Sequence, residues 1–550
     1  MRHIRWRITN SEAAIFYGLL ILHLAPLWLF TYFPTQDGPA HLYNSRIIGD
    51  WFWSDFSVFR DYLMLNPRFD PTWFDHLILA GLMKLVSPMM SERLFLTVYV
   101  VAFPMSIRYA LGAVGSQARF LSVLGFPFIY NAVFHYGFFS FSFSLAVYCF
   151  FIGYWLRHAE SLRWRSAAGL VALSVLLYFT HVISMALAYL SAAVLSGGWW
   201  IARVAALYNA RQLTVRSLRS ASWKLLVRPA LTLLPALALL LVFLSDRAHA
   251  TLAGPGFYER LQDFVHLGVL YVFQQRELVL AATLAMLFWA LCLWFIVDGW
   301  GQRRFRREDV LLLLALVLAA CYFLAPDPVI VSASGTVGGA FTKERLNLFP
   351  FLALLFWLGG REFSPARKQF VQLAGITLTL AFLAVHLAHY RTINSQIDEY
   401  LSAIDRVPPN STLLPLFAAH RGLAPNGNPV SGKVDPILHA SNLAGAERPI
   451  LVLLNYEANL GYFPVQFQLS RDPYVHIGDI EGAPPKVDLL DYAPKTGGRI
   501  DYVLVWLGRK KNTDSPDLRA VYAQLDKAFK KVFVSEHGLA ELYQYDQPHR

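Results

Sequence analysis

Long apolar runs separated by short polar stretches occupy the chain from residue 13 to about residue 389. This pattern is typical of a polytopic α-helical membrane protein. We predict spans at 13–33, 92–112, 117–130, 138–156, 166–181, 184–203, 229–245, 279–297, 309–325, 346–359 and 370–389. Residues 73–90 are short and carry Asp75, His76 and Lys84, so we expect a re-entrant or interfacial segment there. The total is about 11 transmembrane helices, or about 12–13 if residues 73–90 also cross the bilayer.

The last part of the chain has a different pattern. Residues 449–456, 501–508 and 539–546 are apolar runs of strand length, whereas 517–532 has a helical pattern. Residues 470–500 are rich in Pro and Gly and are expected to be loops. We therefore predict a transmembrane domain over residues 1–390 and a small C-terminal α/β domain over 391–550.

Composition and charge fix the class and the sidedness. The chain is 56% hydrophobic and only 15% charged, with a net charge of +11. Its basic residues cluster in short loops at 157–165, 203–228, 303–307 and 361–368, which the positive-inside rule places in the cytoplasm with the N-terminus. We therefore expect no nucleic-acid partner, an uncleaved first span, and outward loops at 34–72, 246–277 and 326–345. The C-terminal domain is then extracytoplasmic, and we expect a bacterial inner-membrane protein with a periplasmic domain.

The stretch PTQDGPAHLYNSRI, residues 34–47, brings several polar residues together directly after the first span. Asp37 precedes Gly-Pro and a helical pattern, so it is either a helix N-cap or an outward-facing carboxylate that acts as a general base. His41 lies one helical turn further and could orient Asp37, bind substrate, or hold a divalent cation (Mg²⁺ or Mn²⁺) with it. Tyr43, Asn44 and Arg46 are further candidates for substrate contacts.

An uncleaved first span followed at once by an outward acidic residue resembles the GT-C superfamily of membrane glycosyltransferases. This superfamily includes the protein O-mannosyltransferases, the aminoarabinose transferases and the catalytic subunit of oligosaccharyltransferase. The resemblance implies that Asp37 is catalytic and that the donor is a sugar on a polyprenyl phosphate. Gly38 stands where many members have a second acid, so no cofactor is expected, with a divalent cation as the alternative.

A second motif, GGAFTKERLNLFPFLALLFW at 338–357, enters a span from the outward side. It resembles a Lys-Glu-x-Arg-Phe junction of GT-C mannosyltransferases, with Lys343, Glu344 and Arg345 in place and Leu346 instead of the aromatic residue. Cations at this surface suit a lipid phosphate, which Arg345 can bind bidentately. The alternative is that Lys343 and Arg345 only snorkel to the interface, with Glu344 as counterion.

Three further residues lie in outward turns or loops and are candidate substrate contacts, namely His135, His181 and Tyr258. Together these observations predict an inverting glycosyltransferase, a hexosyl- or pentosyltransferase, at the outer membrane face. Its acceptor would be a glycolipid, a polysaccharide or a protein. The alternative is a non-catalytic protein that binds or transports polyprenyl-linked glycans. The sequence contains no nucleotide-binding motif such as a P-loop.

Overall fold

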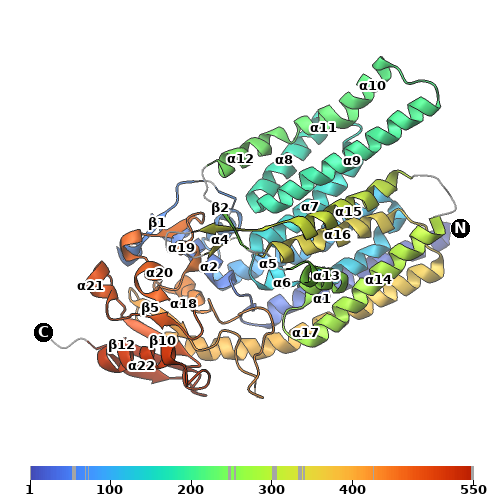
Figure 1. Ribbon diagram of the computed structural model, residues 1–550. Coiled ribbons are helices and arrows are strands. Elements are labelled where there is room, and N and C mark those ends of the chain that lie inside the picture. The colour runs from blue at the N-terminus through green and yellow to red at the C-terminus, as the bar shows by residue number, and fades with distance from the viewer. Residues whose placement is uncertain are drawn as a thin grey trace.

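The computed structural model describes residues 2–52, 57–68, 70–71, 73–245, 249–252, 256–299, 306–331, 337–338, 341–424 and 426–546. Parts of the aromatic stretch 50–56, of the outward loops 246–277 and 326–345, and of the basic loop 303–307 lie outside these ranges. Figure 1 shows a bundle of long helices with the C-terminal domain, orange to red, at one end.

Six helices of the described residues are long and apolar enough to cross a membrane. They are α1 (Arg2–Leu29), α5 (Pro88–Val114), α7 (Phe139–His158), α9 (Val182–Asn209), α14 (Gln275–Gly299) and α17 (Pro365–Ile404). A seventh span is formed if the pair Val215–Leu231 and Leu234–Leu244, bent by 50°, is taken as one. It consists of α10 (Val215–Ser222), η2 (Trp223–Val227), α11 (Arg228–Leu231) and α12 (Leu234–Leu244). The helical membrane class is confirmed.

The number of spanning helices is smaller than the predicted 11–13, because several predicted spans form shorter elements. Among these, α8 (Trp164–Thr180) has 17 residues and α15 (Val310–Leu324) has 15, so they reach about 22–26 Å against the roughly 30 Å of a hydrocarbon core. The run at 117–130 forms a buried 3₁₀ segment, η1 (Ser116–Phe128), and α16 (Thr342–Gly359) begins with three charged residues. Residues 73–90 contain α4 (Trp73–Leu82), whose ten residues are too short to span.

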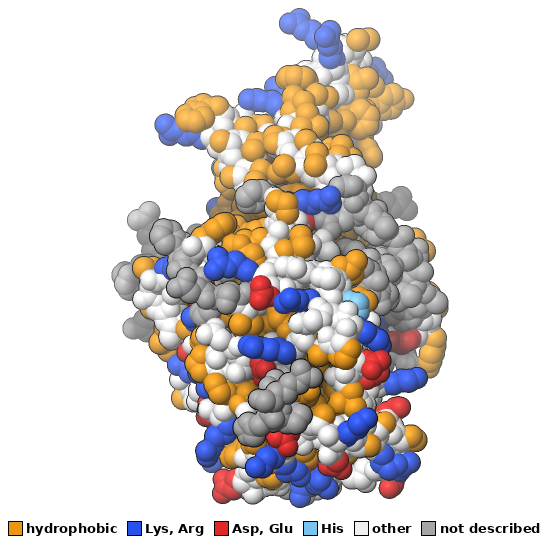
Figure 2. Space-filling view, turned by 90° about the vertical axis from the view of Figure 1, so that its left-hand side faces the viewer, with side chains coloured by type: hydrophobic (Ala, Val, Ile, Leu, Met, Phe, Trp, Pro, Cys, Tyr) orange, Lys and Arg blue, Asp and Glu red, His pale blue; other side chains and the backbone are white. Residues whose placement is uncertain are grey.

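Exposed apolar side chains follow one face of the long helices. On α14, four apolar side chains are at least 60% exposed, namely Val279, Met286, Leu293 and Val297. Their spacing of seven or four residues places them on the same helix face. Figure 2 shows the projecting helices as mostly hydrophobic, whereas charged side chains of both signs gather over the C-terminal domain below them. This division of surface fits a lipid-embedded bundle with a water-exposed domain, so the chain is an integral membrane protein.

The C-terminal domain is built on a five-stranded sheet with the strand order β11-β12-β10-β5-β6. The strands are β5 (Thr412–Phe417), β6 (Leu451–Val452), β10 (Tyr502–Trp506), β11 (Phe529–Val534) and β12 (Ala540–Tyr545). Strand β5 pairs in parallel with β6 and β10, and β12 pairs antiparallel with β10 and β11. The predicted α/β domain is confirmed. The helix predicted over 517–532 ends at Ala528 as α22 (Pro516–Ala528), because the residues that follow it pair with β12.

Further short elements complete the chain. They are α3 (Ser57–Tyr62), α6 (Ala132–His135), α13 (Phe257–His266), η3 (Gly268–Leu270), η4 (Arg307–Asp309), α18 (Ser441–Glu447), α19 (Tyr456–Asn459), η5 (Leu469–Arg471), α20 (Pro473–His476), α21 (Tyr492–Thr496) and the strands β2 (His249–Leu252), β3 (Asp327–Val331), β4 (Val337–Gly338), β8 (Gly478–Asp479) and β9 (Lys486–Val487). Strands β2, β3 and β4 form one three-stranded sheet. The region 470–500 therefore holds several short elements as well as loops.

Helix α17 joins the two parts of the molecule. It begins at Pro365 after the N-cap Ser364 and continues for 40 residues without a break. Its Tyr400 ring stacks on Phe417 of β5, with ring centroids 6.0 Å apart, and meets Trp506 of β10 edge-on at 5.4 Å. The predicted domain division at residue 390 thus falls inside a helix that belongs to both parts (Figure 1).

The loop after α1 packs against the C-terminal domain. It contains α2 (Gly38–Asp50) and the strand β1 (Leu63–Leu65), which pairs antiparallel with β7 (Val465–Phe467). Helix α2 lies against α18 and against α4. As a result, residues about 400 positions apart in sequence come together at this surface, where the candidate site lies.

Candidate functional site

Asp37 is held in a fixed position by the turn that follows α6. Its backbone N–H donates to the Tyr136 carbonyl at 3.0 Å. Gly137 has a φ of +87°, and a Cβ added there would lie 2.5 Å from the backbone nitrogen of Gly38. This close approach of two backbone segments needs a glycine, so the position of Asp37 after the first span is set by the fold rather than by a free loop.

The side chain of Asp37 does not cap α2. Its backbone is already helical, and the carboxylate accepts no hydrogen bond from the first turn. Instead Oδ1 accepts from Gln36 Nε2 at 3.2 Å and lies 3.4 Å from His439 Nε2. Burial on its own lowers the pKa of His439, but the Asp37 carboxylate together with Glu481 and Glu457 outweighs it and raises the pKa. A buried carboxylate with an imidazole partner is an arrangement suited to proton transfer.

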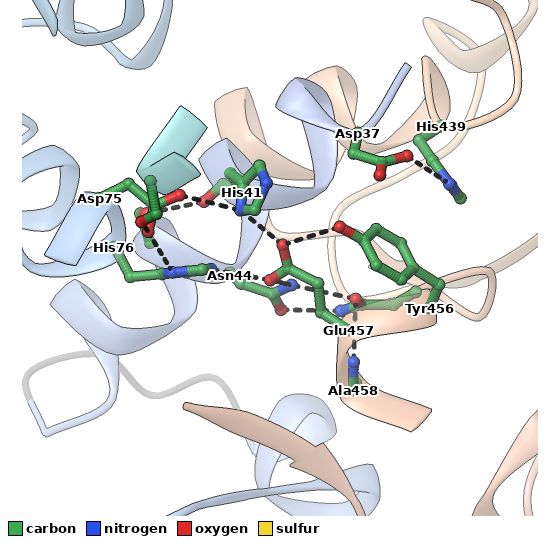
Figure 3. A network of polar contacts seen from close by, with 12 residues as sticks. Asp37, His41, Asn44, Asp75, His76, His439, Tyr456, Glu457 and Ala458 are labelled. Carbon is green, nitrogen blue, oxygen red and sulfur yellow. Dashed lines mark hydrogen bonds and ion pairs between the residues drawn. The ribbon is translucent and has the colours of Figure 1, made fainter. Parts of the chain in front are cut away.

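His41 lies on the other side of α2, in a buried cluster with three further residues (Figure 3). His41 Nδ1 is 2.6 Å from Glu457 Oε1 and 3.1 Å from Asp75 Oδ2. His76 Nε2 is 2.7 Å from Glu457 Oε2, and its Nδ1 is 3.2 Å from Asp75 Oδ1. The structure therefore joins His41 to residues of α4 and α19, and Figure 3 shows Asp37 pointing toward His439 instead.

Tyr43 and Asn44 attach α2 to the C-terminal domain. The Tyr43 hydroxyl donates to the Ile450 carbonyl and accepts from the Val452 N–H, both at 3.1 Å. Asn44 Nδ2 donates to Glu457 Oε2 at 2.7 Å and to Asn455 Oδ1 at 3.0 Å. Both side chains are fully buried, so they hold the two parts of the site together.

Arg46 also attaches α2 to the C-terminal domain. It forms an ion pair with Asp50, one helical turn away, and its Nη1 donates to the Ala446 carbonyl of α18 at 2.8 Å. Three of the predicted substrate contacts, Tyr43, Asn44 and Arg46, therefore bind the C-terminal domain in this structure.

Arg345 packs on a cluster of aromatic rings that includes Tyr136, the residue whose carbonyl binds the Asp37 backbone. The guanidinium carbon of Arg345 is 4.5 Å from the centre of the Phe138 ring. The ring of Tyr136 lies 5.6 Å from that of Phe138 and 4.8 Å from that of Phe341. Because the Tyr136 backbone also holds Asp37, a carboxylate and a cation border the same aromatic cluster.

Lys343 is surrounded by acids. Its Nζ lies 2.5 Å from Asp263, 2.8 Å from Glu259 and 3.7 Å from Glu344. Burial lowers the pKa of Lys343, but the hydrogen bonds to Asp263 and Glu259 outweigh it and raise the pKa above its usual value. Lys433 adds a further cation, 3.6 Å from Glu344. Glu344 is thus a weaker partner of Lys343 than the two acids of α13.

The side chains of the remaining three candidates make contacts other than with Asp37, although the His135 carbonyl accepts from the Gln36 N–H at 2.9 Å. His135 is fully buried, with Nδ1 2.9 Å from the Asn131 carbonyl and Nε2 2.6 Å from the Tyr390 hydroxyl. His181 caps α9 by accepting from the Ile183 N–H at 3.2 Å. Tyr258 is 71% exposed on α13, next to Glu259. His135 thus connects α6 to α17, and His181 has a local capping role. Tyr258 is linked to the Lys343 cluster through its neighbour Glu259.

Sequence reasoning missed His439, Glu457 and the partners of Lys343. His439 and Glu457 stand in a loop and a four-residue helix of the C-terminal domain, and no periodicity connects them to residue 37 or 41. Asp75 and His76 could be identified as candidates, because ionisable residues in a short apolar run indicate function. Their partner Glu457 could not be predicted from the sequence.

The chain resembles known proteins in its fold but not in its sequence. No family model and no curated protein matches the sequence. The crystal structure of ArnT from Cupriavidus metallidurans bound to undecaprenyl phosphate matches with a TM-score of 0.53 at 12% identity, over 97% of this chain and 98% of ArnT. The structure of the same protein in the apo state matches with a TM-score of 0.50 at 12% identity, over 98% of each chain. The chain is therefore a membrane protein with the fold of ArnT.

Proposed function

We propose that this protein is an inverting GT-C glycosyltransferase that takes a sugar from a polyprenyl-phosphate carrier. The single observation that carries this proposal is the position of Asp37. It follows the first span directly, contacts His439, and borders the aromatic cluster on which Arg345 lies. The ArnT comparison supports the choice of donor, because a protein of the same fold binds undecaprenyl phosphate.

In the proposed reaction an acceptor hydroxyl or amine attacks the anomeric carbon on the face opposite the phosphate. The new bond forms as the bond between this carbon and the phosphate oxygen breaks, and the acceptor proton passes to Asp37. The leaving phosphate gains negative charge. Arg345 can stabilise this charge by donating two parallel N–H hydrogen bonds to the phosphate oxygens. Inversion of the anomeric centre follows from this single displacement.

Lys343 has a supporting role in this proposal. We assign the direct phosphate contact to Arg345, because a guanidinium can present two parallel N–H donors to a phosphate. The ammonium of Lys343 instead forms ion pairs with Asp263 and Glu259. Lys343 then holds α13 against α16 through these two ion pairs. We place the reaction at the periplasmic face of a bacterial inner membrane, with a glycolipid, a polysaccharide or a protein as acceptor.

The test is sugar release from a panel of polyprenyl-phosphate sugars by purified wild type and Asp37→Asn, with a membrane extract as acceptor source. We expect release by wild type and a loss of about 10²–10⁴-fold in Asp37→Asn, with carrier binding retained. Asp61→Asn is the matched control, since Asp61 lies in the same loop with its side chain 63% exposed, and should behave like wild type.

Two outcomes contradict the proposal. Equal release by wild type and Asp37→Asn would show that Asp37 is not the base. No release from any donor, with the carrier still bound, would favour the non-catalytic protein that binds or transports polyprenyl-linked glycans.

A further inference from the structure

Four buried metal-ligating side chains meet where the loop after α1 contacts the C-terminal domain. His41 comes from α2, Asp75 and His76 come from α4, and Glu457 comes from α19. Their side chains are between 0 and 8% exposed. One ligand atom each of His41, Asp75 and His76 can be chosen so that all lie within 4.8 Å of one another.

The contacts of His41 are not those of an ordinary hydrogen-bonded histidine. Its Nδ1 lies 2.6 Å from Glu457 Oε1 and 3.1 Å from Asp75 Oδ2, yet neither contact has hydrogen-bond geometry. Asp75 Oδ2 also has no hydrogen-bond partner. Buried polar atoms are almost always paired, so two facing atoms without a hydrogen bond, His41 Nδ1 and Asp75 Oδ2, indicate a ligand between them.

The other oxygen of each carboxylate is hydrogen-bonded to His76 and to a neutral donor. His76 Nδ1 lies 3.2 Å from Asp75 Oδ1 and Nε2 lies 2.7 Å from Glu457 Oε2, so His76 must exchange one of these hydrogen bonds for the metal. Ser140 Oγ donates to Asp75 Oδ1 at 2.8 Å, and Asn44 Nδ2 donates to Glu457 Oε2 at 2.7 Å. Outer contacts of this kind orient the ligands of a metal.

Asp75 Oδ2 faces His41 without a hydrogen bond, while Glu457 Oε1 accepts a long one from Tyr456 at 3.5 Å. Donors at 2.0–2.2 Å from a tetrahedral zinc ion lie about 3.3–3.6 Å apart, so the 2.6 Å contact between His41 and Glu457 must open by about 0.7–1.0 Å to admit the ion.

We propose that His41, Asp75, His76 and Glu457 form a structural zinc site that fastens the C-terminal domain to the loop after the first span. Two imidazoles and two carboxylates suit Zn²⁺, whereas Mg²⁺ prefers oxygen ligands and water. Four protein donors with almost no exposure correspond to a closed structural site. The two carboxylate charges balance a divalent cation when both histidines are neutral.

The site has a consequence for Asp37. Tyr456 precedes Glu457 in the chain, and its ring lies 4.9 Å from that of His439. His439 in turn contacts Asp37. Zinc at the cluster therefore fixes α19, and through it the imidazole beside the carboxylate. The inference itself does not depend on glycosyl transfer, because it concerns metal binding by the resting protein.

The experiment uses the full chain in detergent, stripped with EDTA and then dialysed against Zn²⁺. Bound metal is counted by inductively coupled plasma mass spectrometry, and Co²⁺ loading gives the visible spectrum of the ligand field. We expect about one Zn²⁺ per chain, a higher Tm for the loaded wild type, and a tetrahedral Co²⁺ spectrum.

Glu457→Gln is the test variant, since glutamine keeps the size of the side chain and a hydrogen-bonding amide but coordinates zinc poorly. It should lose stoichiometric Zn²⁺ and the zinc-dependent rise in Tm. Asp37→Asn is the matched control, because Asp37 is a nearby buried carboxylate outside the cluster, and it should keep the zinc even where transfer is lost.

Three results would overturn the inference. Wild type could bind no more Zn²⁺ than Glu457→Gln, which would make the cluster a metal-free histidine–carboxylate network. Mg²⁺ could bind and Zn²⁺ not, which would exclude the imidazole ligands. Asp37→Asn could lose the metal with an unchanged size-exclusion profile, which would place the ion elsewhere. If Glu457→Gln does not fold, the zinc content and Tm of stripped and reloaded wild type decide the question.

Discussion

Replacing Tyr43 by Phe tests how strongly the first loop is attached to the C-terminal domain. Strand β6 is the edge strand of the sheet, and the Tyr43 hydroxyl accepts from the Val452 N–H there while it donates to the Ile450 carbonyl. Tyr43→Phe keeps the buried ring and removes only these two hydrogen bonds.

The magnitude follows from the two contacts. A buried hydrogen bond contributes about 0.5–1.5 kcal/mol, and a buried N–H left without a partner costs about 1–3 kcal/mol. We therefore expect Tyr43→Phe to lower the free energy of unfolding by about 2–4 kcal/mol. The assay is a denaturant titration of the detergent-solubilised protein, followed by tryptophan fluorescence.

Tyr258→Phe is the matched control, because it makes the same chemical change at a side chain that is 71% exposed. It should change the free energy of unfolding by less than about 0.5 kcal/mol. Equal effects of the two substitutions would refute the reasoning, since the Tyr43 hydroxyl would then not bridge the loop and the edge strand.

Three further predictions follow from other contacts. Gly137→Ala should destabilise the protein by about 1–3 kcal/mol more than Gly427→Ala, because both residues have positive φ but only at Gly137 would the new Cβ meet backbone atoms; thermal unfolding measures the difference, and equal losses would contradict the clash. Arg345→Gln should raise KM for the polyprenyl-phosphate donor about 10–100-fold, and Arg345→Lys should raise it less. An unchanged KM in both variants would exclude a phosphate contact by Arg345. Burial raises the pKa of Asp472 to about 6, so wild type loses stability as the pH rises from about 4 to about 6. Asp472→Asn cannot titrate and should therefore gain about 1–3 kcal/mol over wild type above pH 6, whereas a constant difference across this range would exclude titration of Asp472.

Local patterns predicted the elements well where one environment dominates. The apolar runs that became α5, α7, α9, α14 and α17 were visible because a bilayer requires long apolar helices. Strands β10 and β12 were visible as short apolar runs between polar ones. The helix predicted to residue 532 was wrong at its end, since pairing with β12 outweighs the helical pattern after Ala528.

The role of Asp37 needed tertiary contacts. Its sequence context, with Gly-Pro and a helix after it, was compatible with an N-cap, and nothing local excluded that role. The structure shows a side chain turned to His439, about 400 residues further along the chain. Sequence periodicity reports only on neighbours within one element, so it cannot reveal such a partner.

The sequence by itself determined a helical membrane protein, a small α/β domain at its end, and an acidic residue directly after the first span. It did so because hydrophobic spacing and length reflect the solvent around each segment. Only the tertiary structure decided that His41 faces Asp75, His76 and Glu457 rather than Asp37, and that Tyr43 and Asn44 hold the C-terminal domain. These pairings depend on how α2, α4 and α19 pack, which is set by contacts between distant parts of the chain.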